Sequence, residues 1–373
     1  MPHKLHRPAS LTLMLIALIG CAPAAQGQGP LACVNAAGES RFGVVAHLSW
    51  RFLYSRQEMA QALDMMAEAG IGRVRLNWSW KDMQPEPGAF HFEQFDAAAT
   101  LAAERGIRLL PILLAVPAWA STAPPELIAE WGSLSPVDRY RPREMAEWLH
   151  YVRVVVERYD GDGVADAPGS PRVGEWEVWN EPNLAAFWPP RANAGEYVAL
   201  LRATHGAIRE ADPTARVALG GLASADAAYL QALYAAGAGP YFDIGSVHAY
   251  IHPTQGSVQG LRALLAEARA VMDAQGDEDK PLWLTEIGWS DAENAWGAPT
   301  ASQEQVAELL RQVYTARLPV DVIFWYNFRN IFDGSADVEH NFGLVYNDFT
   351  PKPAFQAYAE LAGECGEGSS EGR

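Results

Sequence analysis

Residues 173–183 read VGEWEVWNEPN, and the interpretation of the whole chain depends on this stretch. It begins with a largely apolar, aromatic run that is typical of a buried β-strand. Asn180, Glu181 and the helix-breaking Pro182 follow this run at once. A carboxylate in such a position is costly unless another group pairs with it or the protein uses it chemically. The sequence therefore raises the question of what Glu181 does.

Similar short runs of apolar and β-branched residues recur from about residue 40, separated by longer segments with helical spacing. Residues 260–274, for example, place Leu261 and Leu265 on one helical face. Ser302 and Gln305 form the capping box that is typical of a helix start. The predicted strands are residues 43–48, 72–77, 107–113, 173–179, 216–220, 242–248, 281–286 and 321–326.

Eight strand-then-helix units predict an α/β fold consisting of a single (β/α)₈ TIM barrel. The alternative is a doubly wound open sheet, but no glycine-rich GxGxxG turn follows the first predicted strand. No composition break or linker interrupts the later chain, so we expect one barrel domain over residues 40–362. Residues 22–39 would form an N-terminal linker, and the polar residues 363–373 a flexible tail.

The catalytic groups of such a barrel come from the carboxyl ends of the strands and the loops after them. Glu181 after the fourth predicted strand and Glu286 at the end of the seventh would face each other across one mouth. Paired carboxyl groups cleave glycosidic bonds, because one protonates the leaving oxygen and the other attacks or stabilises the anomeric carbon. Further polar and aromatic residues near these strand ends are His47, Arg75, Asn77, Trp119, Asn180, His248, Tyr250 and Trp325.

Motifs at these positions resemble those of clan A retaining glycoside hydrolases. Residues 179–182 (WNEP) are similar to the strand-four signature of the clan, 285–289 (TEIGW) to its nucleophile segment, and 248–250 (HAY) to its strand-six motif. The chain most resembles family 39, which includes β-xylosidases and endoglycosidases that trim bacterial exopolysaccharides. Residues 343–345 (GLV) and 351–354 (PKPA) also resemble the end of these barrels, so the resemblance covers the whole predicted domain.

The resemblance implies a role for each matching residue. Glu181 would be the acid/base and Glu286 the nucleophile of a double-displacement reaction. Arg75 would keep Glu286 ionised, and Tyr250 would orient its carboxylate. Further substrate contacts would come from Asn180 at the sugar 2-hydroxyl, from Trp325 as the floor beneath the sugar, and from His248, His47 and Trp119.

Structural roles are open alternatives for several of these residues. Arg75 could belong to a structural ion-pair network, and His248 and Tyr250 could be hydrogen-bonded core residues. Either sugar stacking or packing at the barrel rim would suit the tryptophans outside the motif strands, Trp119, Trp188, Trp289 and Trp296.

The resemblance also bears on the substrate. Xylosidases of family 39 usually carry an additional β-sandwich, which has no counterpart after the predicted barrel, so we expect an endo-acting enzyme on a polysaccharide such as a bacterial exopolysaccharide. An exo-acting β-xylosidase and a family 5-like cellulase or mannanase are the alternatives among enzymes. A carbohydrate-binding lipoprotein on an inactive barrel is the alternative from another class, and the presence of both carboxylates disfavours it. We expect a monomer that needs no cofactor and binds oligosaccharide or polysaccharide.

The N-terminus has the features of an export signal. A basic flank precedes the apolar residues 11–19, a run too short to span a bilayer. Residues 18–21 (LIGC) resemble the bacterial lipobox, in which Cys21 would be lipidated and become the mature N-terminus. Ordinary cleavage near residues 22–24 is the alternative. We therefore expect residues 1–21 to direct export, giving an outer-membrane lipoprotein or a periplasmic or extracellular protein.

Cys33 and Cys365 are the cysteines outside this signal segment. Exported proteins fold in an oxidising compartment, where such a pair can be bridged. The first and last strands of a closed barrel are neighbours, which brings the two ends of the domain together. We therefore predict a disulfide between Cys33 and Cys365.

The composition excludes other classes of function. A formal net charge of −17 argues against nucleic acid as a partner. Residues 160–166 (DGDGVAD) invite a calcium-site interpretation, but the glycine and terminal glutamate of an EF-hand are misplaced, so we expect a solvated turn and no metal site. The sequence also lacks the GxSxG elbow of serine hydrolases.

Overall fold

The structure is a computed structural model that describes residues 33–34, 38–292 and 300–367. Its strands are β1 (Phe42–Val45), β2 (Arg73–Ser79), β3 (Arg108–Leu114), β4 (Glu175–Val178), β5 (Arg216–Leu219), β6 (Gly245–His248), β7 (Leu282–Ile287) and β8 (Val322–Trp325). Its α-helices are α1 (Arg56–Glu68), α2 (Trp80–Met83), α3 (Glu93–Glu104), α4 (Pro125–Trp131), α5 (Met145–Arg158), α6 (Ala194–Ala211), α7 (Ala227–Ala235), α8 (Val258–Ala274), α9 (Gln303–Thr315) and α10 (Pro353–Glu367). Strands and helices alternate along the chain as the sequence pattern predicts.

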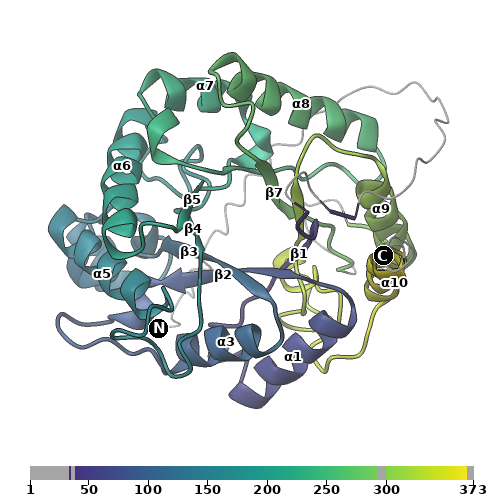
Figure 1. Cartoon of the computed structure of the whole chain (residues 1–373), viewed down its shortest axis with the longest axis horizontal. Coiled ribbons are helices and arrows are strands. Elements are labelled where there is room, and N and C mark those ends of the chain that lie inside the picture. Colours follow the sequence, from purple (N-terminus) through teal and green to yellow (C-terminus); the bar gives the residue numbers. More distant parts are fainter. Residues whose placement is uncertain (1–32, 35–37, 293–299, 368–373) are drawn as a thin grey trace, which may run out of the picture.

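The strands form one parallel sheet in the order β5-β4-β3-β2-β1-β8-β7-β6. The remaining seam, between β5 and β6, is joined by the bridges Ala218–Ile244 and Leu222–Val247. Figure 1 shows the strands in the centre of the molecule and the long helices arranged around them. The predicted (β/α)₈ barrel is therefore confirmed.

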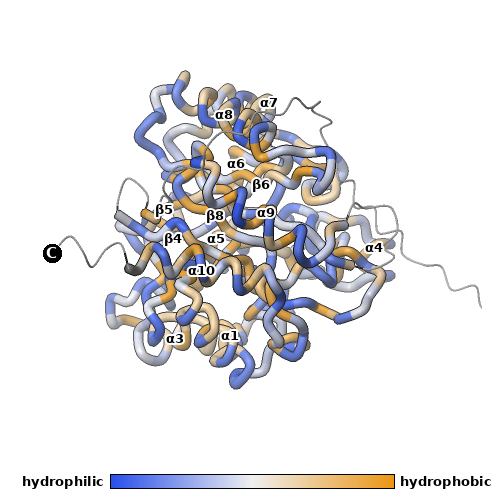
Figure 2. Tube along the Cα trace, turned by 90° about the vertical axis from the view of Figure 1, so that its right-hand side faces the viewer, coloured by the Kyte–Doolittle hydropathy of each residue, from blue (hydrophilic) through white to orange (hydrophobic). Residues whose placement is uncertain are grey.

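Two apolar layers hold the barrel together. Side chains alternate along each strand, so one set fills the barrel and the other packs against the helices. Phe324 reaches the interior because Gly43 on the neighbouring strand has no side chain; a Cβ there would lie 2.7 Å from the Phe324 ring. Figure 2 shows hydrophobic residues gathered along the inner segments and hydrophilic ones on the outer turns. The interior cluster consists of Val45, Leu110, Ala218, Ile244, Trp283, Val322 and Phe324.

Helix starts agree with the sequence signals. α9 begins after Ser302, and Ser302 and Gln305 make both hydrogen bonds of the predicted capping box. α8 buries Leu261 and Leu265, as its apolar spacing predicts. The residues that form each of these signals are only three or four positions apart, so the sequence alone predicts them.

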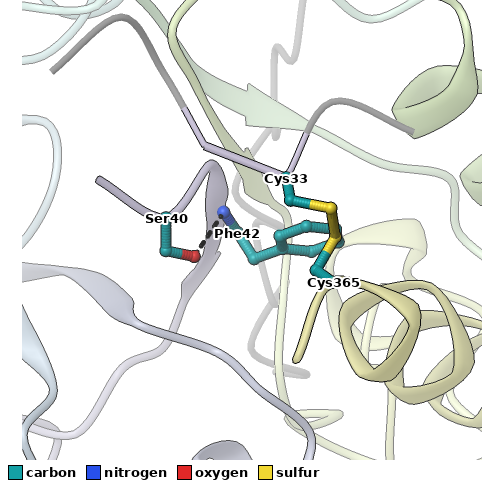
Figure 3. The surroundings of a disulfide bond; sticks show 4 residues. All are labelled: Cys33, Ser40, Phe42 and Cys365. Carbon is teal, nitrogen blue, oxygen red and sulfur yellow. Dashed lines mark hydrogen bonds between the residues drawn. A yellow bond between two sulfur atoms is a disulfide. The ribbon is translucent and has the colours of Figure 1, made fainter. Parts of the chain in front are cut away.

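A disulfide links Cys33 to Cys365, which lie 332 positions apart in the sequence and have their Cα atoms 5.3 Å apart. Figure 3 shows the bond beside the ring of Phe42, whose backbone N–H donates to the hydroxyl of Ser40 at 3.2 Å. Because Phe42 begins β1, the bridge fastens the last helix to the entry of the first strand. The predicted disulfide is present.

The boundary predicted for the tail is wrong for its first residues. α10 continues to Glu367 instead of ending near residue 362. Leu361 and Ala362 are buried against the barrel, and the disulfide at Cys365 holds the following turn. The proposed signal segment with Cys21 lies outside the described residues. No helix among the described residues is long and apolar enough to cross a membrane.

Candidate active site

Glu181 is carried by an unusual backbone directly after β4. Both Trp179, with φ 72°, and Glu181, with φ 45°, adopt left-handed conformations that side chains other than glycine rarely take. The backbone N–H of Glu181 donates to the carbonyl of Gly221 at 3.1 Å, which ties this turn to the loop after β5. Such conformations persist where the surroundings enforce them, and they cluster at functional sites. The strand end thus directs the Glu181 carboxylate in a fixed direction.

Glu286 lies near the end of β7 and is held by two donors. Nη1 of Arg75 donates to its Oε1 at 2.6 Å, and the hydroxyl of Tyr250 donates to its Oε2 at 2.7 Å. Burial opposes ionisation of this carboxyl, but His248, Arg75 and Tyr250 together lower the pKa of Glu286 below its usual value. Glu286 is therefore an oriented, ionised carboxylate.

His248 connects the two carboxylates. One oxygen of Glu181, one oxygen of Glu286 and a ring nitrogen of His248 all lie within 4.8 Å of one another. Nδ1 of His248 is 2.9 Å from Oε1 of Glu181 and 3.5 Å from Oε2 of Glu286. The ring fits because Gly221 has no side chain; a Cβ there would lie 2.0 Å from Nε2 of His248.

Arg75 is the centre of a buried ion-pair network, of which the sequence predicted the contact with Glu286 but not the one with Glu177. Its guanidinium holds the fully buried Glu177 of β4 in a bidentate pair at 2.6 and 2.8 Å. Nη2 of Arg75 also donates to Oδ1 of Asn180 at 2.9 Å. Burial acts to lower the pKa of Arg75, but Glu177 and Glu286 raise it above its usual value, so the cation is retained. The missed signal was a charged residue in the middle of a buried strand.

The predicted floor residue is wrong by one position. Trp325 is fully buried on the face of β8 that packs against the helices, with its ring 5.5 Å from that of Trp289. Phe324 points into the barrel, so the next inward position belongs to Tyr326. The ring of Tyr326 lies 6.2 Å from that of Tyr250, whose hydroxyl donates to Glu286. Tyr326 therefore occupies the place that we had predicted for Trp325.

His47 follows β1 and lies close to Glu286. It is 6% exposed, and neither of its ring nitrogens has a hydrogen-bond partner among the described residues. Its ring stacks on Trp50 at 3.9 Å and meets Tyr326 edge-on at 5.9 Å. Burial lowers the pKa of His47 to about 4, although Glu286 opposes this shift. A neutral imidazole here offers one donor and one acceptor to a ligand.

The tryptophans outside the motif strands differ in exposure. Trp119 is half-buried, stands edge-on to Trp80 at 5.4 Å and donates from Nε1 to the carbonyl of Gln84 at 3.1 Å. Trp188 and Trp289 are buried in the core, so packing is their role. The fourth tryptophan of this set, Trp296, lies outside the described residues.

Two further charged groups influence the carboxylate pair and were not predicted. Glu339 lies on a short 3₁₀ helix, Val338–His340, in the loop after β8. Burial, with the charges of Glu286, Asp337 and Glu181, raises the pKa of Glu339 to about 7. Arg139, in the loop between β3 and β4, interacts electrostatically with both Glu181 and Glu339. Neither residue lies on a strand, so no periodic pattern marked it.

The described residues contain two groups of possible metal ligands. The first, Glu181, His248 and Glu286, is a poor cation site because the Arg75 guanidinium already contacts Glu286.

The second group is Asp160, Asp162 and Asp166. These aspartates accept hydrogen bonds from backbone N–H groups of their own loop, including those of Gly163 and Val164, as expected of a solvated turn.

Comparisons with known proteins place this chain beside glycoside-cleaving families. The family model described as "Glycosyl hydrolases family 39" matches residues 133–363, more than half of the chain. A model described as "Beta-galactosidase" matches residues 52–208. The beta-galactosidase BgaH of Haloferax lucentense is 30% identical over 139 residues, which are 34% of this chain and 20% of that protein.

Solved structures share the fold. A family 39 glycoside hydrolase from Bacteroides cellulosilyticus WH2 superposes with a TM-score of 0.66 at 23% identity, covering 86% of this chain and 63% of that chain. A monomeric beta-xylosidase from Caulobacter crescentus CB15 gives a TM-score of 0.64 at 18% identity, covering 86% of this chain and 67% of that chain. The chain thus spans less than two thirds of the first structure and a fifth of BgaH.

Proposed function

Because this chain belongs to glycosyl hydrolase family 39, we propose that it is a retaining β-glycosidase that cleaves the O-glycosidic bonds of a polysaccharide by double displacement. The observation that carries the proposal is the pair of carboxylates, which approach within 4.8 Å with His248 between them. Retaining enzymes place these groups about 5–5.5 Å apart, too close for a water molecule to attack between them.

In the first step, the Glu286 carboxylate would attack the anomeric carbon while the bond to the leaving oxygen breaks. Glu181 would give its proton to that oxygen, and Arg75 and Tyr250 hold the nucleophile in position. In the second step, Glu181 would take a proton from water as the water attacks the same carbon. The ester to Glu286 then breaks, and the sugar leaves with its original configuration.

The remaining contacts suit a bound sugar. Oδ1 of Asn180 accepts from Arg75, and the amide nitrogen of Asn180 would donate to the 2-hydroxyl of the sugar. His47 offers ring nitrogens that have no partner among the described residues, and Tyr326, whose ring lies 5.9 Å from that of His47, would form the floor in place of Trp325. Trp119 would contribute no hydrogen bond to the sugar, because its indole N–H already donates to the carbonyl of Gln84.

We further propose that the substrate is cut internally, that a bacterial exopolysaccharide is a suitable substrate class, and that the enzyme acts as an exported monomer. A screen of the purified protein against a panel of polysaccharides, with product sizes measured, tests the internal cleavage and the substrate class. A ladder of oligosaccharides supports endo action, whereas monosaccharide alone contradicts it. NMR of the first product should show the β-anomer; an initial α-anomer would contradict the retaining mechanism.

A further inference from the structure

Three aromatic rings form a row along the loop after β1. His47, Trp50 and Phe52 stack in this order, with ring centroids 3.9 Å apart in the first pair and 5.4 Å apart in the second. Exposure rises along the row, from 6% for His47 through the half-buried Trp50 to 68% for Phe52. Among the large apolar side chains of the described residues, Phe52 is the most exposed. The row thus joins the buried site to the surface.

The loop that carries this row is fixed by its neighbours. The hydroxyl of Ser49 donates to the carbonyl of Asn77 at 2.7 Å, and Nη1 of Arg329 donates to the carbonyl of Leu53 at 2.6 Å. A ring on such a loop is already in place before a ligand arrives, so little conformational freedom is lost on binding. Phe52 is therefore a preorganised apolar surface.

The row begins on the side of the nucleophile. Tyr250 donates to Glu286 and lies 6.2 Å from Tyr326, which lies 5.9 Å from His47. In the sheet, β8 alone separates β1 from β7, whereas both β2 and β3 separate it from β4 and Glu181. In double displacement the attacked sugar lies over the nucleophile and the leaving part lies beyond the acid. The row therefore extends from the glycone side.

We infer that Phe52, supported by Trp50, is the stacking surface for a sugar ring one unit beyond the sugar that Glu286 attacks. The inference rests on the proposed function and specifies the direction in which the bound saccharide chain extends from the site. The apolar face of a pyranose matches a flat aromatic ring, and the row leads from the site to that ring without interruption. A substrate that occupies both positions continues past the cleaved sugar toward its non-reducing end, as cleavage of an internal bond requires.

Kinetics with 4-nitrophenyl β-glycosides of one and two sugar units separate this inference from the proposed function. The glucoside with the cellobioside, and the xyloside with the xylobioside, are the probes. Phe52→Ala should lower kcat/KM on the two-unit substrate about three- to tenfold, and far less on the one-unit substrate. Phe52→Trp, which keeps an aromatic ring at this position, should retain the higher kcat/KM on the two-unit substrate. Leu134→Ala, at a position 63% exposed in the loop after β3, is the matched control and should leave both values unchanged.

Equal losses of Phe52→Ala on the two substrate lengths would overturn the inference while leaving the proposed function intact. If glycosides of neither length are cleaved, calorimetry with cellotriose and xylotriose takes the place of kinetics, and the proposed function fails only when the polysaccharide panel yields no product either. Weaker binding to Phe52→Ala than to the unchanged protein then supports the stacking surface. Equal binding, or none to either protein, overturns it.

Discussion

Arg75 and Glu286 are 211 residues apart in the sequence, yet Nη1 of the arginine donates to Oε1 of the glutamate at 2.6 Å. The same guanidinium pairs with Glu177, whose side chain is 0% exposed. One cation therefore pairs with Glu286, the proposed nucleophile, and with a second carboxylate that water cannot reach. Ionisation of Glu286 and stability of the barrel mouth therefore depend on the same residue.

Replacing Arg75 should destabilise the protein as well as inactivate it. Arg75→Met leaves Glu177 buried without a counter-ion, and breaking a buried pair in this way costs about 3–5 kcal/mol. Urea unfolding measures the loss. Arg51→Met is the control, because Arg51 and Glu93 form a pair with side chains 64% and 75% exposed, worth less than about 1 kcal/mol. Equal stability losses in the two variants would contradict the network described for Arg75.

Variants that lack one of the two proposed catalytic carboxylates should lose activity in different ways. Glu286→Ala should be nearly inactive on all substrates, because no covalent intermediate can form. Glu181→Ala should still be glycosylated by 2,4-dinitrophenyl glycosides, whose leaving group needs no proton, and should lose about 10²–10⁴-fold on poorer leaving groups. Added azide should restart it and yield a β-glycosyl azide, identified by NMR. An α-azide from Glu181→Ala would reverse the assignment.

Glu339 should make stability depend on pH in an unusual direction. Its folded pKa is raised to about 7 from an ordinary 4.5, so the folded state holds the proton more tightly than the unfolded chain. This contribution is most favourable below pH 4.5 and is lost as the pH rises through 7. Glu339→Gln removes the effect, so its gain in unfolding free energy over the unchanged protein should be roughly 2 kcal/mol larger at pH 8 than at pH 5. The same gain at both pH values would refute the shift.

Loss of the disulfide should lower stability without altering the arrangement of Glu181 and Glu286. The entropic model assigns on the order of 5 kcal/mol to a bridge that closes so long a loop, although measured values are often smaller. Cys365→Ser should therefore melt earlier than the oxidised protein, and reductant should lower the melting temperature of the latter alone. Mass spectrometry of non-reduced peptides should identify the Cys33–Cys365 cross-link, and two free thiols in exported protein would contradict it.

Cys21 should carry a lipid if the lipobox resemblance is correct. Ala22 follows it, and the absence of Asp at that position favours the outer membrane in the sorting rule that the segment resembles. Cys21→Ser should become soluble in the periplasm, as fractionation and immunoblotting would reveal. Unchanged membrane association of this variant would show that the anchor lies elsewhere.

The fold and the two carboxylates could be predicted because their signals are local. Apolar runs mark the strands, Glu181 lies in the turn that follows β4, and Glu286 lies near the end of β7. Trp325 shows the limit of this reasoning. Successive side chains on a strand point to opposite faces. An error of one residue therefore assigns to the site a side chain that packs in the core. Tyr326 could be identified only once the register of β8 was known.

The supporting residues depend on contacts that sequence does not reveal. Glu177 is intelligible only beside Arg75, because alternate strands of the barrel contribute to one interior layer. Glu339 comes from an irregular loop, and its position is set by tertiary packing. The tail prediction failed for a similar reason. A polar composition indicated flexibility, but the disulfide at Cys365 fixes the last turns of α10.

The bridge between Cys33 and Cys365 encloses every strand and nearly all of the helical chain in one covalent ring. A protease that cuts a single surface loop would open this ring without releasing a fragment, and the nicked barrel could remain assembled through its parallel strand pairs. Release of a peptide fragment from within the ring would require two cleavages. For an enzyme proposed to work outside the cytoplasm, closure of the ends thus converts a vulnerable linear chain into one that tolerates a first cleavage.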